Sequence, residues 1–140
     1  MRFFINLIFI FIFIRCNSNE NQLIRCSDLI KKDGLIKNSN KPFSGTCKDT
    51  TNGVIELRSY LKGIPNGEWK KFHANGTVAY EGNYSDGKID GEFVSYHTNG
   101  VIKGIGKIDM GYKVGAWIYY DSLGIEIQKK MYTRDGILIE

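Results

Sequence analysis

The sequence has little proline, little cysteine and little excess charge of either sign. Its 140 residues include two Pro and three Cys, and its formal net charge is +4. So few cysteines do not make the disulfide framework of a small secreted mini-protein. The weak positive charge does not indicate a nucleic-acid-binding protein, because such domains carry strongly basic surfaces. Glycine and aromatic residues are abundant instead, with 16 Gly, eight Phe, eight Tyr and two Trp.

A long apolar run lies at the N-terminus. Residues 3–14 are almost all apolar and hold five of the eight Phe, with Arg2 before them. A charged start and a 12-residue apolar run are typical of a secretory signal peptide. The run is shorter than the roughly 20 residues that span a bilayer. We therefore predict a signal peptide over residues 1–15. Its removal takes away Arg2 and Arg15 and leaves a net charge of +2, so no nucleic-acid partner is predicted.

Cys16 follows the apolar run and resembles the acceptor cysteine of bacterial lipoproteins. A diacyl group on Cys16 would hold the chain on a membrane. The lipoprotein pattern has a small residue before the cysteine, whereas this chain has Arg15. Two alternatives to lipidation therefore stay open. The signal peptide is cleaved in the ordinary way near Ser18, or it remains uncleaved as an anchor. We expect an exported protein of the cell envelope, either a membrane-anchored lipoprotein or a periplasmic or extracellular protein.

If Cys16 carries lipid, Cys26 and Cys47 remain as a pair in an oxidising compartment. A disulfide between them would close a loop of about 20 residues and add about 3 kcal/mol to the free energy of unfolding. Two unpaired thiols are the alternative. We assign residues 16–41 to a tether and an N-terminal cap, which this disulfide would fasten to the rest of the chain.

The rest of the chain is periodic. Three segments align without gaps at a spacing of 24 residues and begin at Gly67, Gly91 and Gly115, after a degenerate copy from Gly45. Because repetition of this kind is the signature of repeat architectures, we divide residues 42–140 into repeats. The repeats are 42–66, 67–90, 91–114 and 115–140.

Each repeat predicts a β-hairpin. Asn-Gly favours the positive φ angles of a type I′ turn, and the flanking segments are rich in β-branched and aromatic residues. No helical periodicity follows the leader. We therefore expect an all-β fold, a single-layer antiparallel meander of about eight strands. The predicted hairpin turns contain Asn75, Gly76, Asn99 and Gly100.

The aromatic residues leave one question open. Trp69 and Phe72 are three residues apart, so a regular strand would point them to opposite faces. Either a bulge restores a common face, or both faces carry aromatic rows. The candidate binding face consists of Trp69, Phe72, Tyr80, Tyr84, Phe93, Tyr96, Trp117 and Tyr120.

The repeat resembles a known family, the MORN repeat, and more closely its bacterial variant form. The residues that carry the resemblance are Tyr80, Gly82, Tyr84, Gly87, Gly91, Phe93, Tyr96, Asn99 and Gly100. It covers roughly residues 33–140 and departs at Gly104, where an aromatic is expected, and at Leu123, where Asn is expected. It implies an extended single-sheet array used as a scaffold, an interaction surface or a module near membranes. Many bacterial members are labelled as antitoxins of toxin–antitoxin systems.

The polar residues of the repeats do not indicate catalysis or a metal. His73 and His97 occupy equivalent positions two strands apart, about 9.5 Å, which is too far to share a zinc ion. The recurring carboxylates, Glu68 with Glu92 and Asp86 with Asp90, lie beside turns, where little would raise their pKa values. The chain lacks the Gly-x-Ser-x-Gly and His-Glu-x-x-His signatures. We predict no enzyme and no cofactor.

We therefore expect a non-enzymatic exported β-repeat protein that binds a protein partner or acts as a scaffold at the envelope. The sequence does not identify the partner. One alternative is an antitoxin or immunity-type neutraliser, whose partner is a toxin. A second is a module that associates weakly with membrane lipid through its scattered lysines. A third, from another class, is a carbohydrate-active enzyme, which would need a cleft with facing carboxylates.

Overall fold

The computed structural model describes residues 23–139. The predicted signal peptide and Cys16 lie outside these residues. Among the described residues, strands dominate, and a single short 3-10 helix, η1 (Cys26–Asp28), interrupts them near the N-terminus.

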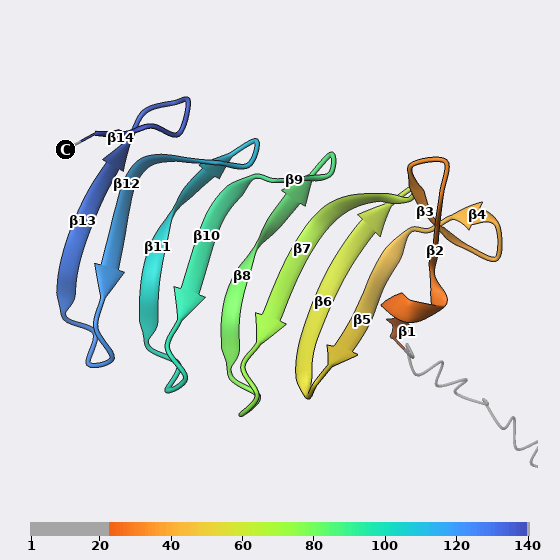
Figure 1. Cartoon of the computed structure of the whole chain (residues 1–140), viewed down its shortest axis with the longest axis horizontal. Helices are drawn as coiled ribbons and strands as arrows, with labels where there is room; N and C mark the ends of the chain where they lie inside the picture. The colour runs from red at the N-terminus through yellow and green to blue at the C-terminus, as the bar shows by residue number, and fades with distance from the viewer. Residues whose placement is uncertain (1–22, 140) are drawn as a thin grey trace, which may run out of the picture.

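The repeats form one continuous open sheet (Figure 1). Its eight long strands follow one another in sequence order, each antiparallel to the next, which confirms the predicted all-β meander. The described sheet has 11 strands rather than about eight, because three two-residue strands extend it. The long strands are β5 (Gly45–Thr51), β6 (Val54–Leu61), β7 (Ile64–Phe72), β8 (Val78–Ser85), β10 (Gly91–Tyr96), β11 (Ile102–Asp109), β12 (Tyr112–Tyr120) and β13 (Glu126–Tyr132), and the short ones are β1 (Ile24–Arg25), β9 (Lys88–Ile89) and β14 (Leu138–Ile139).

A small cap covers the N-terminal end of the sheet. Strands β2 (Ile30–Lys32), β3 (Leu35–Asn38) and β4 (Lys41–Pro42) form a separate three-stranded sheet, while β1 pairs with β5 in parallel. Cys26 and Cys47 form a disulfide with their Cα atoms 5.0 Å apart. Cys47 belongs to a small buried cluster with Phe43 and Tyr60, against which Ile24, Cys26, Leu29 and Ile36 pack.

In the repeats 67–90 and 91–114 the two turns differ in backbone conformation. Asp86 and Gly87 both have positive φ (46° and 84°), as a type I′ turn requires. At Asn75-Gly76 only the glycine does (85°), so the predicted type I′ turn is wrong there, and likewise at Asn99-Gly100. The Asn75 carboxamide oxygen accepts a hydrogen bond from the Thr77 N–H. This local bond holds the asparagine at negative φ in a longer loop that the His73 and Thr77 backbone closes.

The β7–β8, β10–β11 and β12–β13 pairs each contain a β-bulge at the equivalent position, and the β6–β7 and β11–β12 pairs contain a further register shift. The bulge between β7 and β8 answers the question of the aromatic faces. Lys71 pairs with Tyr80 but Phe72 pairs with Val78, so the extra residue is Ala79 in β8. The equivalent extra residues are Lys103 in β11 and Ile127 in β13. Since this bulge lies in β8, β7 alternates regularly from Trp69 to Phe72. The register shift between β6 and β7 lies before Trp69. Trp69 and Phe72 therefore point to opposite faces, and both faces of the sheet carry aromatic residues.

Candidate interaction surface

A continuous row of aromatic rings runs along one face of the sheet. Trp69 lies 6.1 Å from Phe93 between ring centroids, and Phe93 lies 5.8 Å from Trp117. Further rings contact these three from neighbouring strands, at centroid distances from 6.0 to 6.5 Å. We call this set the aromatic row; it consists of Trp69, Tyr80, Tyr84, Phe93, Trp117, Tyr119 and Tyr132.

The eight residues of the predicted binding face do not lie together. Five of them belong to the aromatic row, whereas Phe72, Tyr96 and Tyr120 lie on the opposite face, as strand alternation requires. Tyr119 and Tyr132 were not predicted. The sequence held a signal for each, because Tyr119 stands two residues after Trp117 and Tyr132 occupies the repeat position of Tyr84.

The row is partly core and partly surface. Trp117 is only 2% exposed because its neighbours cover it, whereas Tyr80 is 40% exposed. Tyr80 lies nearly parallel to Trp69, with 6.4 Å between the ring centroids and 5° between the ring planes. One face of the Tyr80 ring is therefore supported by Trp69 while part of the side chain remains open to solvent. The row packs one face of the sheet, and Val94 is buried on the other.

Glycines let the rings approach the backbone. A Cβ atom built on Gly106 would lie 2.4 Å from the Trp117 indole, and one on Gly104 would lie 3.0 Å from the Tyr119 ring. The departure from the repeat pattern at Gly104 has a structural reason, because Tyr119 fills the space that an aromatic side chain there would take. In the preceding repeat the position of Gly104 is occupied by Tyr80, whose own ring belongs to the aromatic row.

Charged groups contact both ends of the row. Glu56 accepts hydrogen bonds from Arg58 Nε (2.7 Å) and from the Trp69 indole N–H (2.8 Å). Burial acts to raise the pKa of Glu56, but these hydrogen bonds and the nearby cations outweigh it and lower the pKa below its ordinary value. At the other end Lys113 Nζ lies 4.1 Å from the Trp117 ring centroid and donates to the Tyr119 hydroxyl at 2.9 Å.

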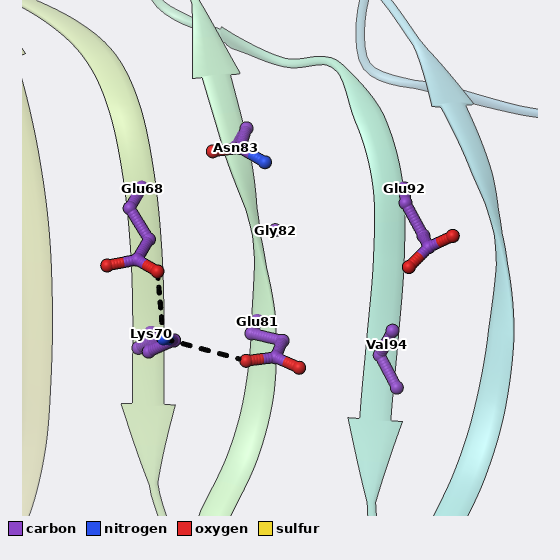
Figure 2. Close-up of a pocket in the computed structure, with 7 residues that line it drawn as sticks. All are labelled: Glu68, Lys70, Glu81, Gly82, Asn83, Glu92 and Val94. Carbon is purple, nitrogen blue, oxygen red and sulfur yellow. Dashed lines mark ion pairs between the residues drawn. The ribbon is translucent and has the colours of Figure 1, made fainter.

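The opposite face carries a shallow polar depression of about 140 Å³ (Figure 2). Lys70 Nζ lies 2.8 Å from a Glu68 carboxylate oxygen and 3.8 Å from one of Glu81. The Tyr96 hydroxyl donates a hydrogen bond to Glu81, and burial together with this carboxylate raises the pKa of Tyr96 to about 12. The repeated carboxylates Glu68 and Glu92 lie on separate strands of this open surface (Figure 2), and Lys70 compensates the charge of Glu68.

The recurring His and Asn side chains at the loops link successive repeats. His73 Nε2 lies 3.1 Å from the Tyr96 carbonyl oxygen, and Asn75 Nδ2 donates to the Thr98 carbonyl at 2.8 Å. The next repeat reproduces both bonds, from His97 to Tyr120 and from Asn99 to Ser122, at 2.9 and 2.8 Å. Within residues 23–139 no three His, Cys, Asp or Glu side chains gather as a metal site would require.

In the last repeat Asp121 and Leu123 replace His and Asn. The Asp121 carboxylate accepts hydrogen bonds from the Leu123 and Ile125 N–H groups of its own loop, each at 2.9 Å. No further repeat follows within the described residues, so an amide at position 123 would have no equivalent carbonyl to reach. This explains the second departure from the repeat pattern.

No helix within residues 23–139 has the length and apolar character to cross a membrane. No curated protein matches the chain. A family model described as the MORN repeat variant matches residues 65–86 and 89–107, which contain most of β7 and β8 and then β10 with most of β11. These two segments are therefore similar to the MORN repeat variant, a repeat typical of binding and scaffold modules that are generally non-catalytic.

Proposed function

We propose that this protein is a non-enzymatic binding module of the cell envelope that recognises a protein partner through the face carrying the aromatic row. The observation that supports this most strongly is the position of Tyr80. Its ring is held against Trp69 and is nonetheless 40% exposed. Supported tyrosine and tryptophan rings are the side chains that most often dominate protein interfaces, because they bury much area with little loss of conformational entropy.

The surroundings of Tyr80 favour a partner surface with both apolar and acidic groups. Lys71 lies directly opposite Tyr80 in the β7–β8 register and so lies on the same face. Phe93 lies on the other side of Tyr80, with 6.0 Å between the ring centroids. An exposed ring with a lysine beside it suits an aromatic or aliphatic side chain flanked by a carboxylate. If the partner that presents such a surface is a toxin, the function of this protein is to neutralise that toxin.

We further propose that the chain is exported and is anchored through a lipid on Cys16. The Cys26–Cys47 disulfide supports export, because disulfides persist in oxidising compartments and are rare in reducing ones.

Affinity capture from the native envelope tests both parts of this proposal. The tagged full-length chain should retain a protein partner, and the mass of its mature N-terminal peptide should show diacylglycerol on Cys16. Tyr80→Ala should weaken capture by at least about 30-fold, the loss typical of an interface hot spot, while the thermal unfolding temperature changes little.

Tyr112→Ala is the matched control, since Tyr112 is 60% exposed at the start of β12 and belongs to no ring contact of the row. It should retain the partner. Equal capture by Tyr80→Ala and the unaltered chain would refute the binding surface. An unmodified N-terminus near Asn19 would refute the lipid anchor.

A further inference from the structure

The two ends of the sheet are covered differently. At the N-terminal end, β1 pairs with β5, and the cap is fastened there by the disulfide. At the other end, β13 is the last long strand (Figure 1). Exposed large apolar side chains are concentrated around it, although terminal repeats of such arrays normally present a polar outer surface. They are Leu123, Ile125, Ile127, Met131, Ile137, Leu138 and Ile139.

The outer edge of β13 is open along most of its length. On that side β14 pairs only with Met131 and Tyr132. Within the described residues, Glu126 and residues 128–130 therefore pair with β12 on one side and with no strand on the other, and Ile127 is the bulge residue between them. An open strand edge offers a row of N–H and C=O groups to a further strand. We call residues 126–130 the C-terminal edge.

The charge order along this edge selects the kind of strand that fits. Glu126 stands at its beginning, and Lys129 and Lys130 stand at its end. Glu126 and Lys129 lie on the same face of the sheet, because they pair with Tyr120 and Ile118 of β12. An identical strand placed antiparallel brings Glu126 of each copy toward Lys129 of the other, so opposite charges meet at both ends. A parallel copy would instead place like charges together. The lysines also disfavour basic and uncharged apolar strands, which is how edge lysines limit unwanted pairing.

The apolar residues follow the same two-fold arrangement. Leu123 and Ile125 precede the edge, and β14 with Leu138 and Ile139 lies beside its far end. Antiparallel pairing brings Leu123 and Ile125 of one copy toward Leu138 and Ile139 of the other. The two-fold symmetry repeats this contact at the other end of the interface. Side chains that are 81% exposed at Leu123 and 64% exposed at Ile127 would then leave water.

We propose that two copies of this chain associate through their C-terminal edges, antiparallel, and join their sheets into one longer sheet. The interface is isologous, since the same strand serves both copies. The occupant of the edge is thus a second copy of the chain, and the aromatic rows of the two copies continue on the same face of the joined sheet.

Co-expression of two differently tagged full-length chains, extracted in mild detergent, tests the proposal. The unaltered pair should capture each other. Glu126→Lys in both copies should reduce capture at least tenfold, and so should Lys129→Glu in both copies. Co-expression of one Glu126→Lys chain with one Lys129→Glu chain should restore capture, because opposite charges then meet again at both ends.

Two exposed charges in the interior of the sheet provide matched controls, Glu92→Lys in β10 and Lys103→Glu in β11. Both should leave capture unchanged. The proposal is overturned if the unaltered chains do not capture each other, if the edge variants capture as well as the controls do, or if the mixed pair is not restored. Association through the N-terminal leader alone would be insensitive to all four substitutions, and that result also refutes the proposal.

Discussion

At Gly106 the absence of a side chain allows the Trp117 indole to lie on the backbone of β11. This is a different requirement from that of the turn glycines, because Gly106 does not have positive φ. The equivalent residue of the preceding repeat, Gly82, has more space, since a Cβ atom there would lie 3.5 Å from its nearest neighbours, the Glu92 carbonyl oxygen and the Phe93 ring. Two glycines at one repeat position thus differ in how tightly a neighbouring ring covers them.

We predict that Gly106→Ala destabilises the protein by about 1–3 kcal/mol, because the new methyl group displaces the buried Trp117 ring. Gly82→Ala should change the free energy of unfolding by less than about 1 kcal/mol, since a methyl group fits there and restricts the unfolded chain. Urea denaturation followed by tryptophan fluorescence compares the two variants. Equal losses of stability would contradict the proposed role of the Trp117 contact.

The hairpin loops that contain Asn75 and Asn99 lie at one end of the strands, and they connect each repeat with the next. Their Asn and His side chains form hydrogen bonds with backbone carbonyls in the following repeat. At the other end of the strands, the N–H groups of Gly87 and Gly111 donate hydrogen bonds to the carbonyls of Pro65 and Ile89. The sequence indicated the loops, but their conformation was predicted wrongly, because the local side-chain bond at Asn75 outweighs the preference of Asn-Gly for a type I′ turn.

We predict that Asn99→Ala lowers the free energy of unfolding by about 1 kcal/mol, because it removes the bond to the Ser122 carbonyl and the bond from the Val101 N–H. Leu123→Ala, at the equivalent position of the last repeat, should change it by less than about 0.5 kcal/mol when both variants are compared in the Glu126→Lys chain, whose edges do not associate, since Leu123 is then exposed. Thermal unfolding of the two variants provides the measurement. A larger loss for Leu123→Ala would show that the loops do not act through inter-repeat bonds.

In the whole molecule, stability is distributed along one dimension. Each long strand contacts chiefly its two neighbours in the sheet. The buried apolar residues are spread along the described sheet, from the small cluster around Cys47 to Ala79, Val94, Ile108 and Trp117. In arrays of this kind a perturbation at one end weakens the nearest repeats first.

We therefore predict that reduction of the Cys26–Cys47 disulfide raises amide hydrogen exchange in β1–β6 and leaves β10–β12 nearly unchanged. The bridge spans 21 residues of sequence and contributes about 3 kcal/mol by restricting the unfolded chain. The comparison uses the full-length Cys16→Ser chain, oxidised and reduced, so that no other thiol pair responds. A uniform rise in exchange through all repeats would show instead that the sheet opens as a single cooperative unit.

The sequence by itself determined the repeat, the strand content and the antiparallel order, because these depend on local periodicity and on the turn residues at each reversal. It could not determine which aromatic residues share a face, since one bulge residue in β8 changes the alternation and sequence spacing does not show in which strand a bulge lies. Nor could the sequence show that Tyr80 is exposed and Trp117 is buried, because both are aromatic residues within strands. Their different exposure depends on rings from other repeats, brought together only by the tertiary structure, and so does the open edge of β13.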